Sequence, residues 1–93
     1  MIRGFRDRET RALFERERPR RFPPDILERA FDKLLMVDAA ERLEDLRVPP
    51  GNRLEALWGA RKGQHSIRVN SQWRICFRWE NGAADDVELC DYH

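Results

Sequence analysis

Three residues at the end of the chain, Asp91, Tyr92 and His93, carry side chains that can move or position protons. The imidazole of His93 titrates near neutral pH, so it is the best general acid or base in the sequence. Asp91 could orient that ring or act as a base itself. Tyr92 could stack on a planar ligand or donate a hydrogen bond. The alternative is that this tripeptide is only a frayed tail.

Four basic side chains form a second group that can do chemistry. Arg74 and Arg78 alternate with apolar residues in one segment, and Arg61 and Lys62 occupy a turn between two glycines. Arg74 could stabilise negative charge that develops on phosphorus, and the other three could hold flanking phosphates.

These cations also have an ordinary structural interpretation. Arg74 and Arg78 could form the solvated face of a half-buried strand, paired with Glu88 and Asp86. Exposed pairs of this kind contribute only about 0–1 kcal/mol each to stability. Arg61-Lys62 could likewise be part of an ordinary polar turn.

The formal net charge of +1 conceals segregated charge. Residues 49–79 contain six basic residues and one acidic residue, whereas residues 80–93 contain five acidic residues and no Lys or Arg. Such segregation creates local fields that the net charge does not report. Of the 18 basic residues 16 are arginine, which suits phosphate binding but can also reflect genome composition alone.

Length and composition limit the architecture to one domain, residues 1–93. The mean hydropathy of −0.79 and the lack of a long apolar run exclude a membrane span. The opening residues 1–5 lack the apolar core of a secretory signal, so a cytoplasmic location is expected. Two cysteines are too few for a disulfide scaffold or a four-ligand zinc site.

Periodicity divides the chain into a helical half and a strand half. Residues 1–5 are expected to form a short strand, residues 10–17 a helix, and residues 23–39 a longer amphipathic helix that begins at two prolines and continues into one further turn at 40–46. After the break at 49–52, strands are expected at 53–57, 65–70 and 73–79 and from Val87 toward His93.

Strand register decides which side chains share a face. A three-residue connection at 81–83 is preferred, because it pairs Phe77 with Val87, Ile75 with Leu89 and Arg78 with Asp86. One sheet face is then apolar and accepts both helices. The other shows Arg74, Arg78, Glu88, Cys90 and Tyr92. The predicted fold is α+β, a two-layer β-α-α-β-β-β arrangement with a small, mainly antiparallel sheet.

The two cysteines have no predicted chemical role. In this register Cys76 and Cys90 are not directly opposite each other, which argues against a disulfide between them. They are expected to be unreactive packing residues.

A family resemblance rests mainly on residues 53–93. The run Gly59-Ala60-Arg61-Lys62-Gly63-Gln64-His65-Ser66-Ile67-Arg68-Val69-Asn70 is followed by Trp73-Arg74-Ile75-Cys76-Phe77, then by Asn81-Gly82 and the terminal Asp91-Tyr92-His93. This sequence closely resembles the HigB toxins of the RelE/ParE superfamily. The opening residues 1–5 and Leu13-Phe14-Glu15 fit the first strand and first helix of the same family.

The resemblance implies a RelE-like fold and a toxin of a type II toxin–antitoxin system. It implies ribosome-dependent cleavage of mRNA in the A site of the 70S ribosome, in the bacterial cytoplasm. It implies a HigA-like helix-turn-helix antitoxin as partner, with operator DNA bound only through that antitoxin. Attack by the RNA's own 2′-hydroxyl needs a base, an acid and cations, and no metal ion or other cofactor.

The chain departs from the family pattern at three positions. Glu55 replaces a catalytic histidine of the family, and a carboxylate can still act as a base there. Trp58 replaces a lysine that would meet phosphate, although its ring could stack. His65 stands where tryptophan is common.

Two other functions remain open at this point. A ParE-like protein of the same fold would inhibit gyrase by binding rather than by catalysis, since fold alone does not fix function. A toxin weakened by Glu55 would act mainly through antitoxin and operator binding.

Overall fold

Four antiparallel strands form one sheet in the order β1-β2-β3-β4. Their bounds are β1 Glu55–Ala56, β2 His65–Arg68, β3 Trp73–Glu80 and β4 Ala83–Asp91. The computed structural model describes residues 1–91. The alternating pattern predicted β3 almost to the residue, whereas the first strand of this half is only two residues long instead of five.

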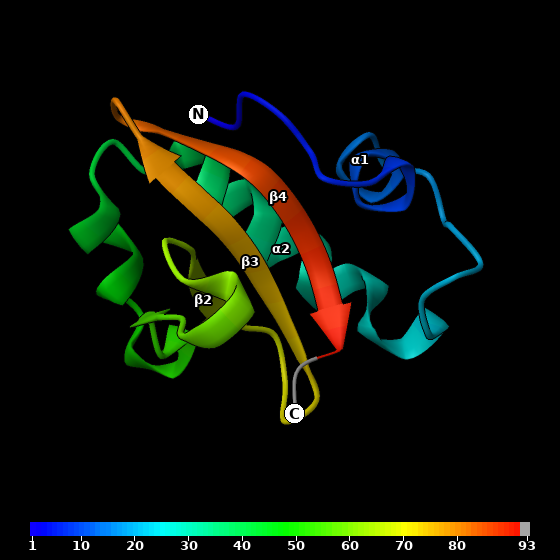
Figure 1. Ribbon diagram of the computed structural model, residues 1–93. Coiled ribbons are helices and arrows are strands. Elements are labelled where there is room, and N and C mark those ends of the chain that lie inside the picture. The colour runs from blue at the N-terminus through cyan, green and yellow to red at the C-terminus, as the bar shows by residue number, and fades with distance from the viewer. Residues whose placement is uncertain (92–93) are drawn as a thin grey trace.

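Two helices lie in the second layer. Helix α1 spans Arg8–Phe14, and α2 spans Leu27–Ala39 and lies behind β3 and β4 in Figure 1. The side chain of Asp7 caps α1 by accepting a hydrogen bond from the backbone N–H of Thr10 at 2.7 Å. Within residues 1–91, no helix is long and apolar enough to cross a membrane.

The core lies between the sheet and the helices. Ile75, Phe77, Val87 and Leu89 are almost fully buried on the sheet face that meets the helices, as the alternation predicts. The buried residues of α2 recur at helical spacing: Leu27, Ala30, Phe31, Leu34 and Val37. This two-layer packing confirms the predicted α+β class.

The opening segment does not form the predicted continuous strand. It makes two isolated parallel bridges to β4, Ile2↔Ala84 and Phe5↔Val87. Between these bridges Asp86 adopts a φ of 50°, the left-handed region, and displaces the edge of β4. The regular ladder is therefore interrupted after the first bridge.

The hairpin between β3 and β4 corrects the predicted connection. Asn81 and Gly82 form a two-residue turn with φ values of 52° and 76°, so Glu80 pairs with Ala83. A β-bulge then sets both Asp86 and Val87 opposite Phe77. The extra residue restores the predicted pairing of Ile75 with Leu89 farther along the strands.

Thr10 joins α1 to the edge of β4. Its side chain is fully buried, and its Oγ1 accepts a hydrogen bond from the N–H of Leu89 at 3.0 Å. We expect Thr10→Val to lower the free energy of unfolding by about 1–3 kcal/mol, because it leaves a buried N–H without an acceptor. Urea unfolding measures this loss, and Thr10→Ser, which keeps the hydroxyl, is the matched control. A Val variant as stable as the wild type would contradict the assignment.

Candidate active site

The sheet face turned away from α2 is covered by the chain segment 53–64. Figure 1 shows this segment on the opposite side of the sheet from α2. Ion pairs and hydrogen bonds join it to β3 and β4, and several polar or small side chains beneath it are buried: Ser66, Arg74, Cys76 and Glu88. The prediction that this face is open is therefore wrong for its central part.

Arg74 is held in a fixed position on this face. Its side chain is 11% exposed, and its Nε donates to Ser66 Oγ at 2.7 Å. Its Nη2 donates to the carbonyl oxygen of Arg53 at 2.7 Å and lies 3.7 Å from Glu55 Oε1. The predicted solvated pair with Glu88 is not formed, because the segment that carries Glu55 covers Arg74. A buried guanidinium with several partners is preorganised rather than free to rotate.

Glu88 is instead the acceptor of two other arginines. Its carboxylate lies 2.6 Å from Arg61 Nη2 and 3.1 Å from Arg6 Nε. Arg61, predicted to hold phosphate, thus bridges the covering segment to β4. Lys62 beside it is exposed. Arg78 Nε lies 3.4 Å from Asp86 Oδ2, so the ion pair expected in the structural interpretation of Arg78 is formed.

An open cationic cleft lies next to Arg74. Its volume is about 350 Å³, and it is lined by Arg53, Arg68, Asn70, Ser71 and Arg74. Arg68 stands directly opposite Arg74 in the pairing of β2 with β3. Like charges in opposed positions repel, so an anion bound between them relieves the repulsion. The cleft is therefore suited to a phosphate group.

Two of the arginines that line the cleft were missed by the sequence reasoning. Arg68 carried a usable signal, since it lies between the apolar residues Ile67 and Val69 and so has to point to the other face. Arg53 carried none, because it reaches the cleft from a residue with a left-handed φ of 46° after a 3₁₀ turn.

Asp91 stands at the same end of the sheet. It pairs with Trp73, and its preceding residue Cys90 pairs with Arg74. Its carboxylate is exposed and accepts a hydrogen bond from Gln72 Nε2 at 3.0 Å. The other two residues of the predicted catalytic tripeptide, Tyr92 and His93, lie outside the described residues.

Glu55 reaches this region from β1. Its side chain is 46% exposed, and it pairs with Arg74 as described above. Trp58 is 81% exposed, so its ring is available to a ligand. His65 lies half-buried against Phe77, with ring centroids 6.4 Å apart, and its burial lowers the pKa of its imidazole.

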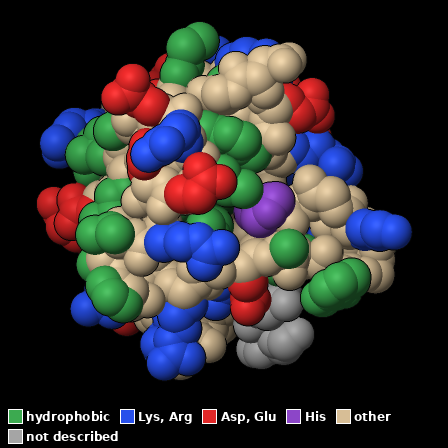
Figure 2. Space-filling model, turned by 90° about the vertical axis from the view of Figure 1, so that its left-hand side faces the viewer, with side chains coloured by type: hydrophobic (Ala, Val, Ile, Leu, Met, Phe, Trp, Pro, Cys, Tyr) green, Lys and Arg blue, Asp and Glu red, His purple; other side chains and the backbone are tan. Residues whose placement is uncertain are grey.

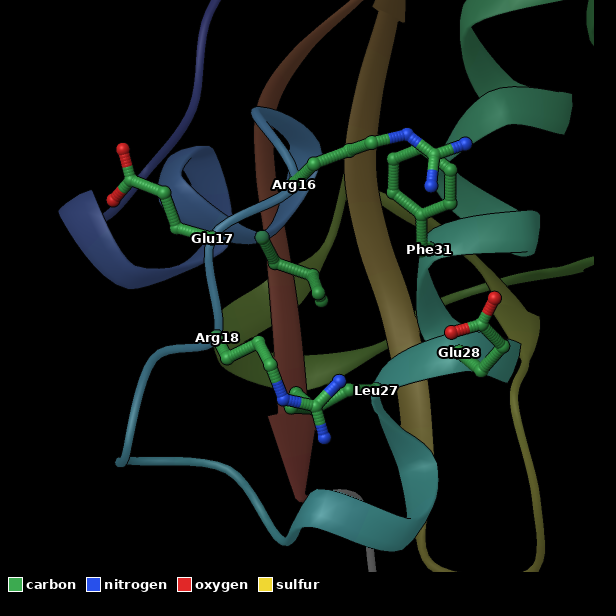
Figure 3. Close-up of a pocket in the computed structure, with 7 residues that line it drawn as sticks. Arg16, Glu17, Arg18, Leu27, Glu28 and Phe31 are labelled. Carbon is green, nitrogen blue, oxygen red and sulfur yellow. The ribbon is translucent and has the colours of Figure 1, made fainter.

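Figure 2 shows charged side chains of both signs interspersed on the side of the molecule that lies on the left in Figure 1. A smaller cavity of about 160 Å³ lies in the helical layer, where Arg16 stacks over the Phe31 ring at 4.2 Å (Figure 3). That cavity lies between α1 and α2, in the layer on the other side of the sheet from segment 53–64. The cationic cleft is therefore the better candidate for chemistry.

Comparisons with known proteins place the chain in a family. Residues 3–93 match the family model described as the RelE-like toxin of the type II toxin–antitoxin system HigB. The chain is 46% identical over 86 residues to Toxin HigB-1 of Vibrio cholerae, covering 91% of this chain and 90% of that protein. It is 33% identical over 93 residues to Endoribonuclease HigB of Proteus vulgaris, covering all of both chains.

A solved structure supports the fold independently. A chain of the YoeB-YefM complex from Staphylococcus aureus superposes with a TM-score of 0.61 at 13% identity, covering 100% of this chain and 98% of that one. At this identity the likeness concerns the fold alone. With the match over residues 3–93, these findings show that the chain belongs to the HigB family of RelE-like toxins of type II toxin–antitoxin systems.

Proposed function

We propose that this toxin is a ribosome-dependent endoribonuclease that cleaves translated mRNA in the A site of the 70S ribosome. The observation that carries the proposal is the cleft between Arg53, Arg68 and Arg74 at the end of the sheet where Asp91 lies. One relative, from Proteus vulgaris, is named an endoribonuclease and aligns along the whole chain.

Transesterification by a 2′-hydroxyl requires an acid, a base and cations, and we assign these roles as follows. Arg74, fixed by Ser66 and the Arg53 carbonyl, stabilises the charge that develops on the scissile phosphate. His93 donates a proton to the leaving 5′-oxygen, and Asp91 orients it or accepts the proton of the 2′-hydroxyl. Tyr92 stacks on a nucleobase or donates a hydrogen bond. The reaction as written calls on no metal ion or cofactor.

Glu55 is the second candidate for the base. Its carboxylate lies 3.7 Å from the guanidinium of Arg74, which lines the cleft. The same position of the family carries a histidine, so a proton acceptor is chemically consistent there. Arg61, Lys62 and Arg78 are proposed to hold flanking RNA; Lys62 is exposed, whereas Arg61 and Arg78 are half-buried.

The partner of a toxin of this family is an antitoxin. We propose that it is HigA-like, with a helix-turn-helix domain that binds operator DNA, so that the toxin meets DNA only through the complex. The bacterial cytoplasm is the compartment in which both mRNA and ribosomes are available to it.

Mapping of 5′ ends on a defined mRNA tests the function. Purified toxin is incubated with the mRNA alone, and with the same mRNA on translating 70S ribosomes. We expect cuts within the reading frame only when ribosomes translate. Equal cleavage of naked RNA would remove the ribosome from the proposal. Absence of cleavage together with inhibition of gyrase supercoiling would replace the enzyme with a ParE-like inhibitor.

Arg68 gives a separate test of the cleft. We expect Arg68→Ala to weaken RNA binding about threefold to tenfold and to reduce the slope of log affinity against log salt by about one, because one phosphate contact is lost. Arg20→Ala is the matched control, since Arg20 is an exposed arginine in the connector between α1 and α2. Binding of a short RNA by fluorescence anisotropy at several salt concentrations measures both effects. Equal losses in the two variants would indicate only general electrostatic attraction.

A further inference from the structure

Cys76 and Cys90 are in direct contact on the covered face of the sheet. Both are free thiols, and their Sγ atoms lie 2.6 Å apart. Cys76 pairs with Glu88 and Cys90 with Arg74, so the register is the predicted one. The cysteines are not directly opposite each other, as predicted, but this does not keep them apart, because the two side chains are diagonal neighbours on the same face. A disulfide needs the sulfurs about 2.0 Å apart, which is a small adjustment from this geometry.

The two thiols are not equivalent in their access to solvent. Cys76 is fully buried, whereas Cys90 is half-buried. An oxidant from solvent therefore reaches Cys90 first, and Cys76 stands behind it. This is the arrangement of an attacking cysteine with an adjacent resolving cysteine.

The contact between the two thiols favours the same division of roles. The hydrogen bond that the two thiols share lowers the pKa of the Cys90 thiol, and the positive charges of Arg61 and Arg74 add to this, against the opposing effects of burial and Glu88. The same hydrogen bond, together with burial, raises the pKa of Cys76. Since the thiolate is the nucleophile, Cys90 is the more reactive of the two.

We propose that Cys90 and Cys76 form a peroxide-sensitive dithiol that closes to an intramolecular disulfide. The Cys90 thiolate attacks one oxygen of a hydroperoxide such as hydrogen peroxide and breaks the O–O bond. This gives a sulfenic acid at Cys90 and releases hydroxide. The sulfur of Cys76 then displaces the hydroxyl group from Cys90, and the two released hydroxides take up protons. In sum, two thiols and one hydrogen peroxide give one disulfide and two waters.

Closure of the disulfide acts on the candidate active site. Cys90 immediately precedes Asp91, lies opposite Arg74, and its thiol points to the Arg74 carbonyl oxygen at 3.7 Å. A bond to Cys76 removes the proton that the Cys90 thiol directs at that carbonyl oxygen, and it ties the residue before Asp91 to β3. Because a shift of about 1 Å at a catalytic group can cost about 10²-fold in rate, we expect oxidised toxin to cleave mRNA at least tenfold more slowly. This consequence rests on the proposed function, whereas the disulfide itself does not.

Intact-mass spectrometry with thiol counting tests the dithiol. The full chain is treated with equimolar hydrogen peroxide and then with dithiothreitol. We expect a monomer that has lost two hydrogens and both of its free thiols, fully restored by the reductant. Cys76→Ser is expected to stop at a sulfenic acid that dimedone traps, and Cys90→Ser to react at least tenfold more slowly than the wild type. Thiols that persist, or dimers linked between chains, would overturn the proposal.

The cleavage assay with ribosomes separates the two claims. Wild-type toxin is compared before oxidation, after oxidation and after reduction, with Cys76→Ser as the control that cannot form the disulfide. Slower cleavage only in oxidised wild type, reversed by reductant, supports the coupling to the active site. Unchanged cleavage by disulfide-linked protein overturns that coupling. If reduced wild type does not cleave at all, the proposed function fails while the mass measurement still decides the dithiol.

Discussion

Replacement of His93 by alanine is expected to slow mRNA cleavage by about 10²–10⁴-fold, the usual contribution of a positioned general acid or base. The expectation rests on the chemistry of imidazole, the side chain whose ordinary pKa lies closest to neutral pH, and on the position of Asp91 two residues earlier at the end of β4. Single-turnover cleavage of mRNA on ribosomes, followed by primer extension, measures the effect. Retained binding to the ribosome would show that the loss concerns chemistry.

A matched control for this variant is available in the same chain. The sequence contains two histidines. The other one, His65 of β2, packs against Phe77 of β3. We expect His65→Gln to alter cleavage by less than about threefold, with folding checked by thermal unfolding. Cleavage by His93→Ala at the wild-type rate would remove the assignment of the acid. In that case Glu55→Gln and Asp91→Asn become the decisive variants for the two remaining acid–base groups.

The strand half of the fold was readable from the sequence because its signals are local. Strict alternation from Trp73 to Trp79 predicted β3, and the match of apolar partners predicted that Ile75 stands opposite Leu89. The turn was not predicted correctly, since two geometries give this same register. A two-residue turn followed by a bulge at Asp86 gives the same pairing as a three-residue turn for the residues that precede Phe77 in β3.

The candidate site was readable only in part. Arg74 was singled out from the sequence and lines the cleft, but its burial was not foreseen, because it depends on the segment 53–64, which comes from elsewhere in the chain and has little regular structure. Arg68 becomes meaningful only when the register of β2 against β3 places it opposite Arg74. Cys76 and Cys90 are diagonal neighbours on β3 and β4, so their contact could not be predicted from directly opposed pairs alone.

The network around Arg74 explains why one arginine can serve both structure and chemistry. Its Nε and one Nη bind protein acceptors, and the cleft opens on the same side chain. Acceptors that hold the guanidinium in place before RNA binds reduce the reorganisation needed at the moment of reaction. The fixed position is also what gives a substitution at Arg74 a large expected effect.

Arg74→Ala is expected to slow cleavage by about 10²–10³-fold, the range found when one preorganised donor to a developing negative charge is removed. We expect Arg74→Lys to recover little of this, because a lysine cannot bind Ser66 Oγ and the Arg53 carbonyl oxygen with the planar fork of a guanidinium. Single-turnover cleavage on ribosomes measures both variants. Arg20→Ala is the control for loss of one positive charge.

A loss of folding could imitate this result, so stability has to be measured in the same variants. Removal of the Arg74 side chain leaves the buried Ser66 hydroxyl without this donor and costs about 1–3 kcal/mol in the free energy of unfolding. Urea unfolding determines that cost, and cleavage is then compared at a temperature where every variant is folded. Cleavage by folded Arg74→Ala within threefold of the wild type would mean that Arg74 only supports the sheet. The charge on the scissile phosphate would then have to be met by Arg53 and Arg68 alone, and the double variant of those two residues would carry the large loss instead.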